Sequence, residues 1–232
     1  MLYYKKSILI FIKFLIAQGL YVNAAYATHT FSILGQGNKA GIIELSVAVT
    51  PTEIDQNMAK TILVESFINE YQKPYLNILP ADIGEGLKHW RGDNASVQKY
   101  YENYFAEELA DFVNGHVHYW VQAKINGKLV GWATFQLEPS EPNAVYMNLL
   151  VVLPEYQNKG VGRTLVFSCM NLKQFNQPDT VHLLLRKKNE GGRIFYKKLG
   201  FFEDPQYHRA DNFVDSTLLE GWSWTKDIAN RQ

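Results

Sequence analysis

The hydrophobic residues of the chain follow two different periods, and the change from one to the other predicts its strands and helices. Residues 41–50 (GIIELSVAVT) are rich in β-branched residues that partly alternate with polar ones, which is typical of a strand. Thr50-Pro51-Thr52-Glu53 then combines an N-cap residue, a proline and an acidic residue, so we expect a helix from here to about Glu70. A second amphipathic helix is predicted over 95–112. The intervening segment 73–94, with its prolines and glycines, predicts a loop or a broken helix.

The second half of the chain predicts a β meander that gives way to strand–helix–strand units. Asn126-Gly127 separates two strand-like runs and favours a hairpin, because a type I′ turn needs positive φ at both central residues. The other predicted elements are strands over 144–152 and 181–187, helices over 163–175 and 190–199, and final strands over 201–202 and 217–226. Gly200 follows directly after the second of these helices, where a glycine typically ends a helix. This order predicts an α/β (α+β) fold in which a mixed sheet carries helices on both faces.

The N-terminal segment differs in composition from the rest of the chain. Lys5 and Lys6 precede a mostly apolar run over 7–22, and Ala25-Tyr26-Ala27 matches a small-x-small cleavage site. These features predict a signal peptide over 1–27. Because Lys13 interrupts the apolar run, an uncleaved anchor and a misplaced start codon stay open as alternatives.

This segment also bears on localisation and domain organisation. We expect an exported, secreted protein, with a cytoplasmic or membrane-associated protein as the alternative, and contact with a membrane only through residues 1–27. Residues 28–40 then form a polar lead-in, and a single domain extends over 41–228.

The overall composition fits a folded, neutral domain. Hydrophobic residues make up 47% of the chain and charged residues 20%, which supports a sizeable core. The 23 basic and 23 acidic residues cancel, which argues against a nucleic-acid partner. The single cysteine, Cys169, lies in a helical pattern and is interpreted as a core residue. His116 and His118 share a strand face without a third ligand, so no metal is expected.

A short loop in the second half carries the candidate chemistry. Pro154–Val166 (PEYQNKGVGRTLV) joins an apolar strand to a helix through polar residues and two glycines. Glycines let the backbone approach a ligand, and a helix start presents free N–H groups, so the segment is suited to a phosphate or pyrophosphate. It is neither a Walker loop nor a dinucleotide fingerprint, because Arg163 and Leu165 stand where those motifs need lysine and glycine. An ordinary tight strand–helix turn is the alternative.

Two motifs resemble the GNAT superfamily of N-acetyltransferases. Gln157-x-x-Gly160-x-Gly162 after a strand resembles the acyl-CoA loop of that superfamily. About thirty residues later, Asn189-x-x-Gly192-x-x-Phe195-Tyr196-x-x-x-Gly200-Phe201 resembles its later motif, with Gly192 in place of the usual alanine. The close resemblance covers 145–202. It implies a twisted, mostly antiparallel sheet of about six or seven strands, with a bulge in strand 144–152 and a V-shaped splay between it and strand 181–187.

The resemblance also implies a cofactor and its site. The co-substrate would be acetyl-CoA, with the pantetheine arm on the strand backbone, the pyrophosphate on the loop N–H groups from Asn158 to Arg163, and a contact from the Asn189 amide. The implied cofactor-binding residues are Leu150, Val151, Val152, Gln157, Asn158, Lys159, Gly160, Val161, Gly162, Arg163 and Asn189.

The implied reaction is direct attack of an amine on the thioester. Tyr196 would protonate the leaving thiolate, since a phenol has a pKa near ~10; the alternative is that it only packs against the cofactor. A backbone N–H near Val152 would polarise the acetyl carbonyl. The base is left open, and the possible residues are Asn148 (as a holder of water), Glu138, Glu44, Tyr119 and His118.

These motifs predict an N-acetyltransferase that acts on a primary amine of a small molecule or protein. A non-catalytic acyl-CoA-binding protein, acting as an interaction partner or a sensor, is the alternative. Tyr196 and the intact loop 157–162 favour the enzyme. The acceptor pocket would come from 73–94, the hairpin and the final strands.

Overall fold

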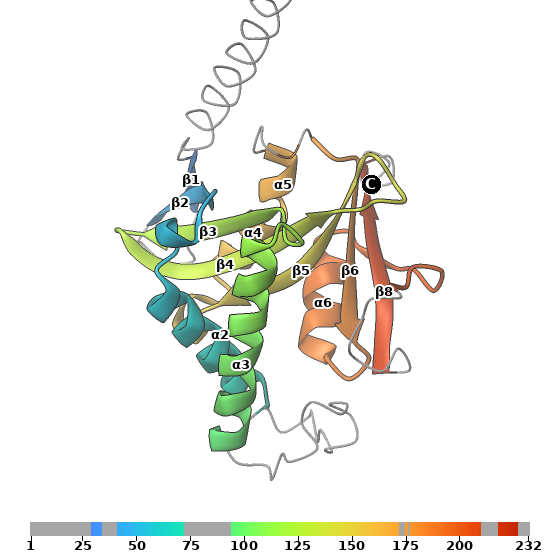
Figure 1. Cartoon of the computed structure of the whole chain (residues 1–232). Coiled ribbons are helices and arrows are strands. Elements are labelled where there is room, and N and C mark those ends of the chain that lie inside the picture. The colour runs from blue at the N-terminus through green and yellow to red at the C-terminus, as the bar shows by residue number, and fades with distance from the viewer. Residues whose placement is uncertain are drawn as a thin grey trace, which may run out of the picture.

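The described part of the chain is built on one eight-stranded sheet, with helices on both of its faces (Figure 1). This computed structural model describes residues 29–33, 41–71, 94–171, 175, 177–209 and 218–226. The strand order is β1-β2-β3-β4-β5-β6-β8-β7, and every neighbouring pair is antiparallel except β5 and β6. The predicted mixed, mostly antiparallel sheet is therefore confirmed. The predicted signal segment 1–27 lies outside the described residues, as does nearly all of the predicted loop 73–94.

The first five strands form an antiparallel meander. Their bounds are β1 (His29–Ile33), β2 (Gly41–Ala48), β3 (Tyr119–Ile125), β4 (Lys128–Leu137) and β5 (Ala144–Val152). The β3–β4 turn has the predicted conformation, with φ of 52° at Asn126 and 76° at Gly127. Strand β1 was not predicted: it lies within the lead-in 28–40 and pairs with β2, so the sheet has one strand more than expected.

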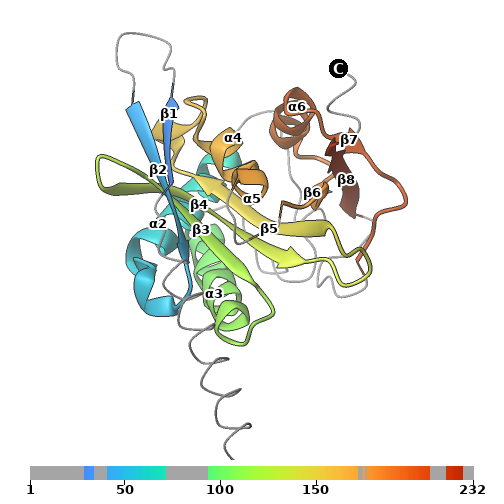
Figure 2. The same cartoon turned by 90° about the horizontal axis from the view of Figure 1, so that it is seen from above.

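Helices α2 (Gln56–Tyr71) and α3 (Asn94–Val113) cover one face, and α4 (Val161–Val166) and α5 (Ser168–Asn171) cover the other (Figure 2). The first predicted helix begins later than expected. Residues 51–53 form a separate turn, η1 (Pro51–Glu53), and Asp55 caps α2 by accepting a hydrogen bond from Met58 N at 3.0 Å.

The predicted helix over 163–175 is divided into α4 and α5 at Phe167. The Ser168 hydroxyl donates to Leu165 O at 2.7 Å, and Cys169 Sγ lies 3.2 Å from Val166 O. Side chains that bond to carbonyls of the preceding turn compete with the helical ladder, which accounts for the break.

Each face of the sheet has its own hydrophobic core. On the α2–α3 side, Trp120 and Trp132 stack with ring centroids 4.4 Å apart, and Phe105 packs edge-on against both. Trp132 Nε1 donates to Ala59 O at 2.9 Å, which ties α2 to the sheet. The α4 side is filled from the strands and from α4, with Leu165 and Cys169 fully buried.

Strands β5 and β6 (Thr180–Arg186) separate soon after they begin. They pair in parallel only from Ala144↔Thr180 to Tyr146↔His182. Strand β8 (Leu219–Thr225) pairs along the whole of β6, and β7 (Phe202–Glu203) lies at the far edge. The V-shaped splay between the central strands is therefore present as predicted.

A β-bulge at Asn148 accompanies the splay. Thr134 pairs with Leu149 and Phe135 with Met147, which leaves Asn148 as the extra residue on β5. The bulge changes the alternation of faces, because Met147 joins the core on the α4 side while Leu149 joins the core on the α2–α3 side. The predicted bulge in this strand is confirmed.

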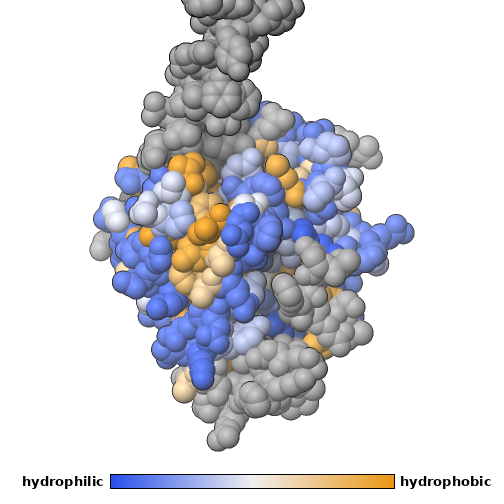
Figure 3. All heavy atoms as spheres, in the orientation of Figure 1, coloured by the Kyte–Doolittle hydropathy of each residue, from blue (hydrophilic) through white to orange (hydrophobic). Residues whose placement is uncertain are grey.

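The described surface is mostly hydrophilic on the face drawn in Figure 3, with a narrow hydrophobic strip near its centre. Among the described residues, none of the helices has the length and apolar character needed to cross a membrane.

Candidate active site

A cavity of about 460 Å³ opens where β5 and β6 separate. Its walls come from α2, the end of β5, the following loop, β6 and helix α6 (Glu190–Lys198). Ten of the twelve residues that the sequence singled out line it: Leu150, Val151, Val152, Gln157, Asn158, Gly160, Gly162, Arg163, Asn189 and Tyr196. The structure thus brings the two sequence motifs together around one space.

The other two predicted residues lie outside this lining. Val161 is fully buried in the core on the α4 side, so its backbone alone can face a ligand. The Lys159 ammonium lies 5.2 Å from the centre of the Tyr156 ring, where it makes a cation–π contact.

The loop between β5 and α4 is shaped by residues with left-handed backbone. Asn158 has φ of 59° and Gly160 has φ of 86°, and Gly160 is the N-cap residue of α4. Successive turns of this kind direct several backbone N–H groups to one side, which makes a concave anion site. Gly162 is small for a packing reason, since a Cβ there would lie 3.1 Å from the Phe195 ring.

The end of β5 directs backbone polar groups into the gap. Leu153 N donates to Val130 O at 2.9 Å, so the Leu153 backbone faces β4. Because alternate residues of a strand direct their N–H and C=O groups to opposite edges, Leu150 and Val152 face the gap. Val151 also lines the cavity, but its carbonyl faces β4, where a Cβ on Gly131 would lie only 2.8 Å from it.

Two side chains fix the carbonyl of Val152. Ser66 Oγ of α2 donates to Val152 O at 2.9 Å, and Gln157 Nε2 donates to the same atom at 3.2 Å. Gln157, which the resemblance implied as a cofactor-binding residue, therefore ties the loop back to β5 through its side chain. The backbone groups of Leu150 also face the gap, and neither Ser66 nor Gln157 bonds to them.

Helix α6 supplies two predicted side chains. Asn189 is its N-cap residue, and Asn189 Oδ1 accepts a hydrogen bond from Gly192 N at 2.7 Å. Tyr196 is 8% exposed, and burial, with a smaller contribution from nearby Tyr146, raises the pKa of the Tyr196 phenol. The phenol therefore keeps its proton at neutral pH and can act as a donor.

Sequence reasoning missed a buried carboxylate beside the bulge. Glu108 of α3 is 5% exposed; the Thr134 hydroxyl donates to it, and the Asn148 side chain hydrogen-bonds to it. Burial is the main cause that raises the pKa of Glu108 to about 7. The hydrogen bonds from Thr134 and Asn148 lower this pKa, and the nearby charge of Asp111 raises it slightly further. A signal existed, because Glu108 stands one turn after Tyr104 and Phe105 on the inward stripe of the helix.

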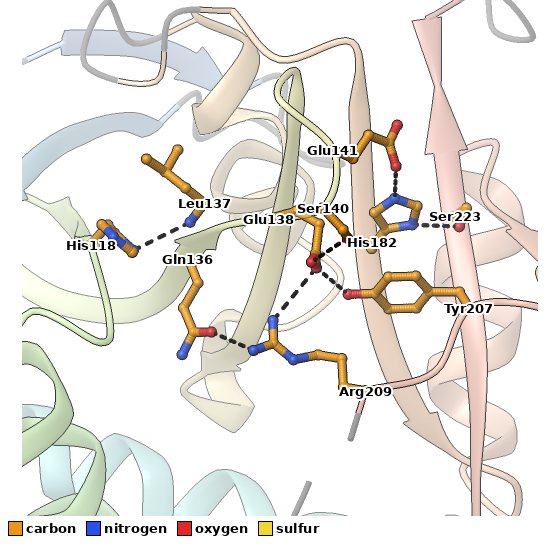
Figure 4. Close-up of polar contacts among 10 residues, drawn as sticks. All are labelled: His118, Gln136, Leu137, Glu138, Ser140, Glu141, His182, Tyr207, Arg209 and Ser223. Carbon is orange, nitrogen blue, oxygen red and sulfur yellow. Dashed lines mark hydrogen bonds and ion pairs between the residues drawn. The ribbon is translucent and has the colours of Figure 1, made fainter. Parts of the chain in front are cut away.

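The other suggested bases lie away from the cavity lining. In Figure 4, Glu138 accepts a hydrogen bond from the Tyr207 hydroxyl at 2.9 Å and pairs with Arg209 at 3.6 Å. Leu137 N donates to Nδ1 of His118 at 3.3 Å, and burial lowers the pKa of His118, helped by His116.

Glu44 and Tyr119 also lie outside the cavity lining. Glu44 is exposed on β2, which is separated from β5 by two strands. The Tyr119 ring packs 4.1 Å from that of Phe175. Within the described ranges, no group of three or more His, Cys, Asp or Glu side chains is arranged to hold a metal.

A sheet that splays at a bulged strand, followed by a left-handed loop and a short helix, defines a class of acyltransferase fold. Residues 84–201, just over half of the chain, match the acetyltransferase (GNAT) family. The chain belongs to the GNAT acetyltransferase family, as its two motifs indicated.

Solved structures share the fold at low sequence identity. PaiA N-acetyltransferase from Thermoplasma acidophilum, in complex with coenzyme A, is 16% identical with a TM-score of 0.55, covering 78% of this chain and 98% of that one. A protein from Desulfovibrio desulfuricans assigned to the GNAT family is 14% identical with a TM-score of 0.51, covering 79% and 98%. No curated protein sequence matches the chain significantly.

Proposed function

We propose that the protein transfers an acetyl group from acetyl-CoA to a primary amine of a small molecule or a protein. The observation that carries this proposal is the cavity at the β5–β6 splay, which Tyr196, the left-handed loop and the free edge of β5 all face. The bound coenzyme A in the PaiA structure supports the same use of this fold.

The described residues fit a coenzyme A molecule along its length. The backbone groups of Leu150 and the N–H of Val152 suit the amides of a pantetheine arm, which would add to β5 like a strand. The loop from Asn158 to Arg163 suits the pyrophosphate, since left-handed residues such as Asn158 and Gly160 can direct backbone N–H groups to one side and Arg163 adds a positive charge. The cap of α6 uses Asn189 Oδ1, which leaves the amide nitrogen as a donor for the cofactor.

The reaction needs three contributions from the chain. A backbone N–H near Val152 polarises the acetyl carbonyl as the amine attacks its carbon. Tyr196 donates its phenolic proton to the sulfur as the carbon–sulfur bond breaks. The amine also gives up a proton, which passes to water, and a hydrogen-bond acceptor close to the acetyl end of the cavity would orient the N–H that is lost.

Release of coenzyme A thiol in the presence of an amine tests the proposal. We expect turnover with acetyl-CoA and either a diaminoalkane or a lysine-containing tripeptide, and no release without amine above the hydrolytic background. Binding of acetyl-CoA without turnover on any amine would replace the enzyme with a non-catalytic acyl-CoA-binding protein.

A further inference from the structure

The bulge on β5 places one amide side chain between the sheet and a buried carboxylate. Asn148 is the extra residue of the bulge, and its side chain hydrogen-bonds to Glu108 on α3. Thr134 on the neighbouring strand donates its hydroxyl to the same carboxylate. Glu108 of α3 is therefore held by contacts from both β4 and β5, and it has no role among the steps proposed above.

Hydrogen-bond accounting fixes which way the Asn148 amide is turned. An ionised carboxylate can only accept hydrogen bonds, so Asn148 presents its NH₂ group to Glu108. The oxygen, Oδ1, is then turned away from Glu108. It is buried, and no described residue donates to it. A buried acceptor without a donor is unfavourable, so this atom suits an N–H group brought by a ligand.

Asn148 comes just before the part of β5 that borders the cavity, although it is not itself one of the described residues that line it. Leu150, two residues further on, lines the cavity. Tyr146, two residues before, lies close enough to Tyr196 for the two phenols to influence each other electrostatically. Along β5, Asn148 thus lies between Leu150, which lines the cavity, and Tyr146, whose phenol acts on the proposed acid.

We propose that Asn148 Oδ1 accepts an N–H of the incoming amine and that Glu108 is the positioning residue that holds the Asn148 amide in this orientation. The inference rests on the proposed acetyltransferase activity and deepens it, because it assigns the subsite of the acceptor amine. The carboxylate behind Asn148 also favours a positively charged or N–H-rich acceptor over an alcohol or an acid.

Ionisation of Glu108 controls this orientation. The charged and titratable groups around it are Asp111 and Tyr104 on α3. Tyr104 is in turn affected by Tyr146 on β5, Tyr100 on α3 and Arg186 on β6. When Glu108 is protonated, its O–H becomes a donor, so the Asn148 amide can reverse and present NH₂ to the amine instead. The rate of reaction with the amine should therefore fall on the acidic side of the Glu108 pKa of about 7.

The test compares Glu108→Gln and Asn148→Ala with Glu107→Gln, which changes the exposed neighbouring carboxylate. The probes are acetyl-CoA with a diaminoalkane or a lysine-containing tripeptide. We expect kcat/KM for the amine to fall about 10- to 100-fold in both site variants, the loss expected when a positioned hydrogen bond is removed. The dissociation constant for acetyl-CoA should stay within about twofold of the wild type. Glu107→Gln should behave as the wild type.

A second readout is independent of turnover. In the wild type, the NMR signals of the Asn148 side-chain NH₂ should shift with pH through about 7, and in Glu108→Gln this shift should be absent. Turnover by the wild type with unchanged amine kcat/KM in both site variants, or Asn148 signals that do not titrate, would overturn the inference alone. A wild type that neither binds acetyl-CoA nor acts on either amine would overturn the proposed function and this inference with it.

Discussion

Asn189 Oδ1 accepts a hydrogen bond from Gly192 N at 2.7 Å, so a single side chain both caps α6 and lines the cavity. The two roles can be separated by substitution. Asn189→Ala removes the cap and should lower the free energy of unfolding by about 1 kcal/mol. Asn189→Asp keeps an acceptor for the cap but replaces the donor nitrogen with a charged oxygen.

We therefore expect Asn189→Asp to keep wild-type stability in urea denaturation while acetyl-CoA binds about tenfold more weakly, which is the effect of one lost hydrogen bond to a ligand. Equal acetyl-CoA affinities for Asn189→Asp and the wild type would show that the side chain serves only as a cap.

Tyr196→Phe removes the phenolic proton with little change in volume. We expect kcat to fall at least about 100-fold, the usual contribution of a general acid, with acetyl-CoA affinity unchanged. Because burial raises the pKa of Tyr196 above its ordinary value, the wild-type rate should show no alkaline loss from this group up to about pH 10. A Tyr196→Phe enzyme with wild-type kcat would leave Tyr196 as a packing residue.

Glu108 makes a predictable contribution to stability against pH. Its pKa is about 7 in the folded protein, above the value of 4.5 for an unperturbed glutamate, so the folded state binds more protons between these values. Stability from this group is present below about pH 4.5 and is lost as pH rises through about 7, by on the order of 3 kcal/mol.

Urea denaturation of the wild type and Glu108→Gln at pH 5 and pH 8 measures this contribution. Both proteins share all other carboxylates, so the effects of those groups cancel in the difference between the two free energies of unfolding. We expect the wild type to lose stability relative to Glu108→Gln as the pH is raised. The opposite trend would mean that the folded protein favours the ionised carboxylate.

Cys169 should be inert in the native protein. It is fully buried, and burial raises the pKa of its thiol to about 12. A thiol-reactive dye should count no thiol in the folded protein and one after denaturation. Rapid labelling of the native protein would contradict the packing of α5 against the sheet.

The sequence predicted those features that depend on neighbours along the chain. The Asn126-Gly127 turn, the strand β5 and the Asn189 and Gly200 ends of α6 all carry local signals, and the two motifs predicted the residues around the cavity. What could not be predicted depends on distant contacts. The roles of Val151 and Gln157 follow from the register of β5 against β4, and the burial of Glu108 follows from its contacts with Thr134 and Asn148.

Two local errors have equally physical causes. The short strand β1 pairs only with β2, and its sequence of mixed polar and apolar residues carries a weak pattern. The helix predicted over 163–175 breaks because the Ser168 hydroxyl bonds to Leu165 O. Amphipathic spacing alone does not predict this side-chain hydrogen bond.

Calorimetric titration of acetyl-CoA into the full chain tests most directly whether the cavity is an acyl-CoA site. The comparison is wild type against Gly160→Asp, with Gly127→Asp as the matched control, since both glycines have positive φ and only Gly160 lines the cavity. We predict binding to the wild type and to Gly127→Asp, and its loss in folded Gly160→Asp. No binding to a folded wild type, or equal binding to all three proteins, would contradict the account.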